Sequence, residues 1–198
     1  FRKDFQNDFN SPFLYSLGIE QKLNKNYTLS FNTSKNFRIP TFNDLYWKPG
    51  GNINLKPEGS YQFEIGNAIS FKNISFQVNG FYIKSSDLIQ WIPNESGYWS
   101  PTNTKSTRNI GIELSANYKT SIKDHFIAIN ANYSYTDAKD LETNQQLISV
   151  PKNRLNGLVN YQHKNWCAYY QLLFNDDVAY LVNTIPSFQV SNLGIEFQ

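Results

Sequence analysis

The sequence predicts an all-β fold, an antiparallel up-and-down meander of about nine strands that forms part of a transmembrane β-barrel. Two observations lead to this prediction. Apolar residues recur at every second position in about nine segments, and the connections between these segments are alternately short and long. No segment shows the 3.6-residue period of an amphipathic helix. No apolar run approaches the ~20 residues that a membrane-spanning helix requires.

Each expected strand places apolar residues on one face and small or polar residues on the other. In Ser60–Phe71, for example, Phe63 and Ile65 alternate with Glu64 and Gly66. Such segments last about ten residues, which suits a tilted bilayer crossing better than the ~5–6 residues of a soluble strand. The expected strands are Phe13–Leu23, Tyr27–Phe37, Ser60–Phe71, Ile74–Lys84, Asn109–Tyr118, Phe126–Tyr135, Leu155–His163, Trp166–Phe174 and Phe188–Phe197, with the end of a further one over Phe1–Phe5.

The connections are of two kinds. The tight ones are Asn24–Asn26, Lys72–Asn73, Ser121–Asp124 and Lys164–Asn165. The long ones are Arg38–Gly59, Ser85–Thr107, Asp137–Asn153 and roughly Asp176–Ser187. In an up-and-down meander this alternation puts all short turns at one end and all long loops at the other, which is typical of outer-membrane barrels.

The alternation is compatible with two environments. In a membrane barrel the apolar face meets lipid and the polar face lines the lumen, which would place Glu64 and Glu113 inside. In a soluble all-β ligand-binding module, of a carbohydrate-binding type, the apolar face would instead pack inward and the polar face would meet water. Periodicity alone does not separate these alternatives.

Composition excludes several classes of function. Lys plus Arg is 18 and Asp plus Glu is 16, which leaves a net charge of +2. So balanced a charge argues against a nucleic-acid partner. An aromatic content of 16% argues against disorder. The chain has no Met, so we expect a processed chain or a piece of a longer one.

No set of residues in the sequence has the spacing of a metal or catalytic site. His125, His163 and Cys167 are separated, and no nearby carboxylates complete a zinc or iron site. No Ser is singled out as the partner of either His in a Ser-His-Asp arrangement. The sequence therefore predicts a protein that is not an enzyme, with no cofactor and no bound metal.

Aromatic residues in the long connections are the candidates for ligand contact, because Trp and Tyr give large, rigid contact surfaces with a polar group. Lys48 and Lys105 lie near them in the sequence and would attract an anionic chelate. The alternative is that these aromatic residues pack the loops or lie in the interfacial girdle, which applies most to Trp91. The candidates are Tyr46, Trp47, Trp91, Tyr98, Trp99 and Tyr180.

One region carries a family resemblance. It contains, in order, Phe37-Arg38-Ile39-Pro40, Leu45-Tyr46, Gly51-Asn52, Leu55-Lys56-Pro57-Glu58 and Glu64-Ile65-Gly66. This order resembles the β-barrel domain of TonB-dependent outer-membrane receptors. Weaker elements agree with it in order: Ser11-Pro12 before the first strand, Asn109-Ile110-Gly111-Ile112-Glu113, and Val150-Pro151-Lys152-Asn153-Arg154.

The resemblance implies that residues 1–198 are part of a receptor barrel in the Gram-negative outer membrane, in contact with lipid. Such receptors import scarce nutrients such as siderophores, haem, cobalamin or glycans, and here a metal chelate or cobalamin is favoured. Energy would come from the TonB complex, acting through a plug segment that has no counterpart in these residues. Family barrels have about 22 strands, so we expect roughly the C-terminal half of a barrel without its last hairpin.

The resemblance also suggests roles for charged residues. Arg38, Glu58, Glu64 and Glu113 would face the lumen and contact the plug. The alternative is that Arg38 and Glu58 attach the long loop to the barrel wall, while Glu64 is a solvated residue of the inner face.

Overall fold

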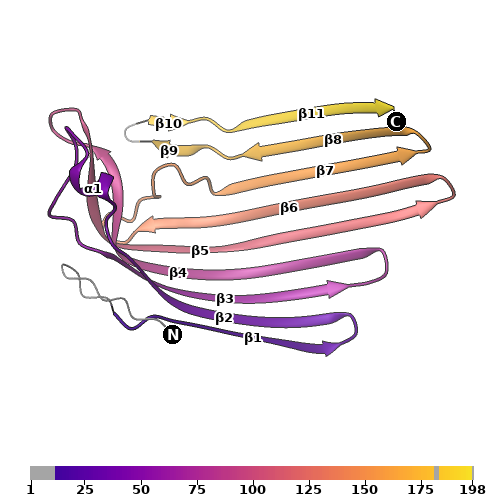
Figure 1. Ribbon diagram of the computed structural model, residues 1–198, viewed down its shortest axis with the longest axis horizontal. Coiled ribbons are helices and arrows are strands. Elements are labelled where there is room, and N and C mark those ends of the chain that lie inside the picture. The colour runs from indigo at the N-terminus through magenta and orange to yellow at the C-terminus, as the bar shows by residue number, and fades with distance from the viewer. Residues whose placement is uncertain (1–11, 181–182, 198) are drawn as a thin grey trace.

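The computed structural model of the protein describes residues 12–180 and 183–197, and it confirms the antiparallel meander. One sheet contains nine strands, and each pairs with its neighbour along the sheet (Figure 1). Their order is β1 (Tyr15–Asn24), β2 (Tyr27–Arg38), β3 (Glu58–Ser70), β4 (Ile74–Pro93), β5 (Trp99–Ile122), β6 (His125–Asp140), β7 (Asn153–His163), β8 (Trp166–Asn175) and β11 (Phe188–Phe197). The expected strand at Phe1–Phe5, and Ser11, lie outside the described residues.

Every pairing in the sheet is antiparallel, and its register follows from the tight turns. Phe31, for instance, faces Ile65, which in turn faces Gly80 on the next strand. Two short strands, β9 (Val178–Tyr180) and β10 (Asn183–Ile185), form a separate hairpin between β8 and β11. The tight turns lie at one end of the sheet, here called the short-turn end, and the long connections at the other, the long-loop end (Figure 1).

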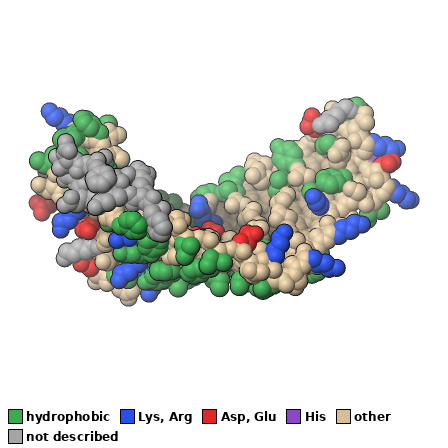
Figure 2. Space-filling view, turned by 60° about the horizontal axis from the view of Figure 1, so that its bottom comes forward, with side chains coloured by type: hydrophobic (Ala, Val, Ile, Leu, Met, Phe, Trp, Pro, Cys, Tyr) green, Lys and Arg blue, Asp and Glu red, His purple; other side chains and the backbone are tan. Residues whose placement is uncertain are grey.

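The two faces of the sheet differ as the alternation predicts. Ile65 and Ile112, on the apolar face, remain 52% and 47% exposed, so among the described residues no second layer covers them. Figure 2 shows the molecule as a curved trough, with hydrophobic side chains gathered along its outer side. A groove of about 370 Å³ on the other face is lined mainly by polar residues, including Asn79, Glu113 and Arg154. This arrangement fits a barrel wall.

The expected long loop at Ser85–Thr107 is wrong. Strands β4 and β5 continue as a hairpin of 20 and 24 residues, paired as far as Pro93 and Trp99. Beyond the apolar band both faces of this hairpin carry polar residues such as Thr102, Asn103 and Thr104. The backbone pairing therefore persists where the two-residue alternation of hydrophobicity ends, because main-chain hydrogen bonds between strands do not depend on alternating side chains.

The other long connections also contain structure that periodicity did not reveal. Strand β6 extends to Asp140, and Lys139 forms an isolated bridge with Gln146. The connection between β2 and β3 holds a short helix, α1 (Phe42–Tyr46). Thr41 and Asp44 form a capping box at its N-terminus. Five residues are too few to show a helical period in the sequence.

Candidate functional site

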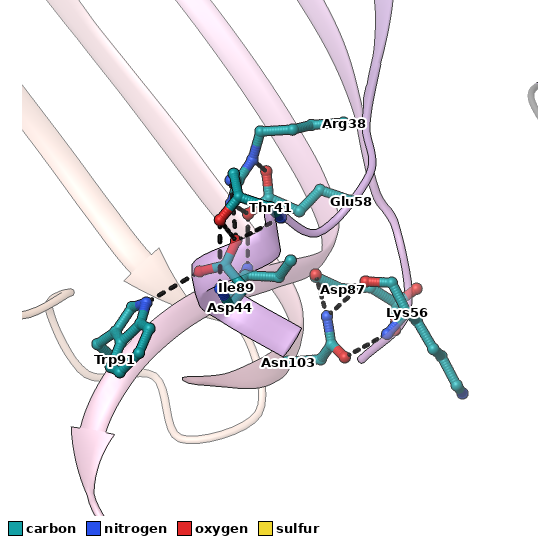
Figure 3. Close-up of polar contacts among 9 residues, drawn as sticks. All are labelled: Arg38, Thr41, Asp44, Lys56, Glu58, Asp87, Ile89, Trp91 and Asn103. Carbon is teal, nitrogen blue, oxygen red and sulfur yellow. Dashed lines mark hydrogen bonds and ion pairs between the residues drawn. The ribbon is translucent and has the colours of Figure 1, made fainter. Parts of the chain in front are cut away.

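The long-loop end of β2–β5 forms a small packed unit, here called the outer arch: residues 39–57, with α1, and the outer hairpin of β4 and β5 from Asp87 to Thr107. Asn103 joins the two parts, because its side chain accepts from Lys56 N at 2.8 Å and donates to Lys56 O at 3.0 Å and to Asp87 O at 2.6 Å (Figure 3). Asn52 adds a bond to the carbonyl of Pro101 at 3.1 Å. The loop is thereby attached to a regular hairpin.

Arg38 and Glu58 close the base of the outer arch. They face each other on β2 and β3, and the guanidinium donates through Nε and Nη2 to the two carboxylate oxygens at 2.6 and 2.7 Å. Glu58 Oε1 also accepts the backbone N–H of Ile89 at 2.6 Å. The bond to Glu58 raises the pKa of Arg38 above its ordinary value. This geometry agrees with the interpretation that the pair attaches the loop to the wall.

Asp44 is the most buried carboxylate of the outer arch, with 5% of its surface exposed. Its oxygens accept bonds from the backbone and hydroxyl of Thr41, both at 2.8 Å, and from Trp91 Nε1 at 3.0 Å (Figure 3). Arg38 Nη1 lies 3.6 Å away. Burial raises the pKa of Asp44, but these hydrogen bonds and the positive charge outweigh it and hold the pKa below the ordinary aspartate value.

The buried apolar side chains of the described residues gather at this end of the molecule. Leu55 and Ile89 are 4% and 9% exposed, and Pro101 is fully buried. Ala138 and Leu147, on the neighbouring connection between β6 and β7, are also buried. The apolar packing that fixes the long loops is therefore separate from the apolar face of the sheet.

The predicted aromatic candidates are only partly brought together. Tyr46 lies in α1, Trp47 follows it, and Tyr98 lies in the β4–β5 turn, each with more than half of its surface exposed. Trp99 begins β5, and its ring lies 6.2 Å from that of Tyr180 at the end of β9. These five residues are here called the outer aromatic surface.

Trp91 differs from the other five, because it lies within β4 rather than in a loop and its indole is committed to Asp44. Sequence reasoning missed Phe42, which is 78% exposed and whose ring centroid lies 4.7 Å from that of Tyr46, with the two planes tilted by 48°. No periodic signal pointed to it, because α1 has only five residues. Lys48 is exposed on the arch, whereas the side chain of Lys105 is not among those that the structure describes.

Glu64 and Glu113 lie on the polar face of the sheet, away from the outer arch. Gln62 donates to Glu64, and Glu113 lines the groove that also contains Arg154. The predicted charged residues therefore separate into two groups: Arg38 and Glu58 are paired with each other in the arch, while Glu64 and Glu113 are on the wall.

His125 and His163, which appear separate in the sequence, are stacked. They face each other on β6 and β7 at the short-turn end, with ring centroids 4.2 Å apart, and His125 Nδ1 lies 2.7 Å from Tyr161 Oη. The two tight turns that flank them were a signal for this pairing. Within residues 12–180 and 183–197, no group of three or more His, Cys, Asp or Glu is placed to hold a metal ion. No helix in this part of the chain could span a membrane.

Several known proteins are similar to this chain. It is 32% identical over 186 residues to the vitamin B12 transporter BtuB of Photobacterium profundum, covering 90% of this chain and 30% of that protein. It is 27% identical over 161 residues to the vitamin B12 transporter BtuB of Vibrio vulnificus, covering 81% of this chain and 26% of that protein. The chain thus spans about 30% of the length of the first of these relatives.

Solved structures show the same fold at lower identity. The copper transporter OprC matches with a TM-score of 0.77 and 18% identity, over 92% of this chain and 31% of that one. The siderophore receptor PirA from Acinetobacter baumannii matches with a TM-score of 0.75 and 19% identity, over 96% of this chain and 35% of that one. The family model described as "TonB dependent receptor-like, beta-barrel" matches residues 1–198, so the chain belongs to the TonB-dependent receptor β-barrel family.

Proposed function

We propose that this chain forms part of the barrel wall of a Gram-negative outer-membrane receptor that imports a corrinoid or another metal chelate. The observation that carries the proposal is the division of one nine-stranded sheet into an exposed apolar face and a polar face. Only a closed barrel satisfies the backbone of such strands in lipid. Family membership supports transport rather than catalysis.

The outer arch supplies the surface for the ligand in this proposal. The outer aromatic surface offers flat rings at the entrance, and the exposed Lys48 adds positive charge for an anionic chelate. Corrinoids are favoured because relatives at 32% and 27% identity are named vitamin B12 transporters. Siderophores are the other class, because structural neighbours include a siderophore receptor.

Transport itself depends on parts beyond these residues. The polar wall around Glu64 and Glu113 would contact a plug, and the TonB complex would move that plug with energy from the inner membrane. In this proposal the chain contributes by binding differently in the closed and open states, and it carries out no covalent reaction. Residues 1–198 would act as one partial barrel domain.

The test is a titration of the full-length receptor that contains this chain with cyanocobalamin, ferric catecholates and oligosaccharides. We expect saturable binding of the corrinoid, or of one chelate, and uptake that requires TonB. Binding of no chelate, corrinoid or glycan would refute the importer proposal. Partition into water without detergent would instead indicate a soluble binding module.

A further inference from the structure

A row of cationic side chains crosses the sheet near its long-loop end. The strand registers place its members directly opposite one another, from each strand to the next. Lys84 faces Arg108, and Arg108 faces Lys139, on strands that lie roughly 4.8 Å apart. The full row runs Tyr15, Lys35, Tyr61, Lys84, Arg108, Lys139 over β1 to β6, and its four cations are here called the basic row.

The basic row borders the apolar face. Tyr82 is two residues from Lys84, and Ile110 is two residues from Arg108, so the cations share a face with these apolar residues. Ile110 itself is 44% exposed. If this face meets lipid, as the proposed function requires, the basic row lies at the depth of the outer headgroups.

The cations are incompletely neutralised by the protein. Like charges directly opposite each other on neighbouring strands are destabilising. Asp137 accepts a bond from Arg108 at 3.0 Å and lies 3.8 Å from Lys139 Nζ. Lys35 Nζ lies 5.2 Å from the centre of the Tyr61 ring, and no described residue pairs with the exposed ammonium of Lys84. The row therefore favours an external anion.

We propose that the basic row binds the phosphate groups of an outer-leaflet lipid whose headgroup carries two or more phosphates. Arg108 Nη2 already donates to Asp137 and its Nε is buried, so the row would attract phosphate mainly through the point charges of its lysines. Tyr15 and Tyr61, in the same row, suit the boundary between acyl chains and headgroups. A lipid, unlike free phosphate, also covers the adjoining apolar face around Ile110 and Ile112, both more than 40% exposed.

The test uses the full-length receptor in neutral detergent, titrated with diphosphoryl lipid A, with its dephosphorylated analogue and with inorganic phosphate. The variant K84Q/R108Q/K139Q removes three charges from the basic row. Its matched control, K25Q/K72Q/K164Q, removes the same charge from the turns at the short-turn end. Heat-modifiable gel migration verifies that each barrel is folded, and the single variant K84Q serves if the triple variant does not fold.

We expect the basic-row variant to bind diphosphoryl lipid A on the order of 100-fold more weakly at low salt, and K84Q roughly fivefold. The control should bind as the parent does. Four results would overturn the proposal. Two concern the variants: the basic-row variants bind the lipid as tightly as the parent, or the control loses as much affinity as the basic-row variant. Two concern the ligands: the dephosphorylated lipid binds as tightly as diphosphoryl lipid A, or inorganic phosphate competes at matched concentration. The same samples are also titrated with a corrinoid. This second titration distinguishes failure of the lipid proposal from failure of the importer proposal.

Discussion

The guanidinium of Arg38 and the carboxylate of Glu58 form a two-point ion pair across β2 and β3, with hydrogen bonds of 2.6 and 2.7 Å. The pair lies where the chain leaves β2 for the long loop and where it returns into β3. Glu58 also accepts the N–H of Ile89. One carboxylate therefore connects three strands at the base of the outer arch.

Replacing Glu58 with Ala should loosen the outer arch by about 1–3 kcal/mol, because the Ile89 N–H loses its acceptor in a half-buried site. The ion pair contributes less, since the Arg38 side chain is 47% exposed. The measurement is the rate of limited proteolysis within residues 39–57 of the folded receptor. The control E95Q changes an exposed carboxylate in the β4–β5 turn, and equal cleavage in both variants would contradict this role.

Acid should loosen the outer arch through Asp44. In the folded protein the pKa of Asp44 is lower than the ordinary aspartate value of about 4. The ionised carboxylate therefore stabilises the arch, and this stabilisation is complete above about pH 4. That stability is lost as pH falls through the lower, folded pKa. Pepsin cleavage of residues 39–57 should therefore rise steeply below about pH 4. Asp44→Asn should weaken the arch already at neutral pH, because an amide has one acceptor oxygen and cannot accept from both Thr41 and Trp91, and it should flatten the acid response.

Trp47→Ala should weaken ligand binding roughly tenfold if the outer aromatic surface contacts the imported compound. Trp47 is 56% exposed and follows α1, so its removal leaves the Asp44 contacts in place. Phe71→Ala is the matched control, since Phe71 is a similarly exposed aromatic residue at the short-turn end. Isothermal titration with the ligand identified in the panel measures both, and unchanged affinity in Trp47→Ala would remove this residue from the site.

Leu55→Ala should destabilise the outer arch by about 2–5 kcal/mol, because the side chain is 4% exposed and leaves a cavity when truncated. Hydrogen exchange within residues 39–57 should accelerate while exchange in the central strands stays slow. Leu193→Ala provides the control, because Leu193 lies on β11 with 73% of its surface exposed. Uniform acceleration across the sheet would show that Leu55 supports the whole fold rather than the arch.

The strands that cross the apolar band were predictable from the sequence, because lipid on one side and a polar lumen on the other impose a two-residue alternation such as that of Glu64 and Ile65. The outer hairpin of β4 and β5 was not, since its polar residues fall on both faces and its apolar residues, such as Leu88, Ile89 and Trp91, do not alternate. The contact of Trp91 with Asp44 joins residues 47 positions apart and depends on the path of the long loop. Local patterns do not encode that path.

Gly111→Ala should impair folding of the barrel, whereas Gly157→Ala should be tolerated. A Cβ at Gly111 would lie 2.2 Å from the carbonyl oxygen of Tyr135 and 2.5 Å from the Phe81 ring, so the backbone itself must shift. At Gly157 the nearest atom is Leu172 Cβ at 3.9 Å, an ordinary contact. Overpacking of this kind costs about 1–3 kcal/mol. The measurement is the fraction of heat-modifiable receptor recovered from membranes, and equal recovery of both variants would show that the sheet relaxes around residue 111.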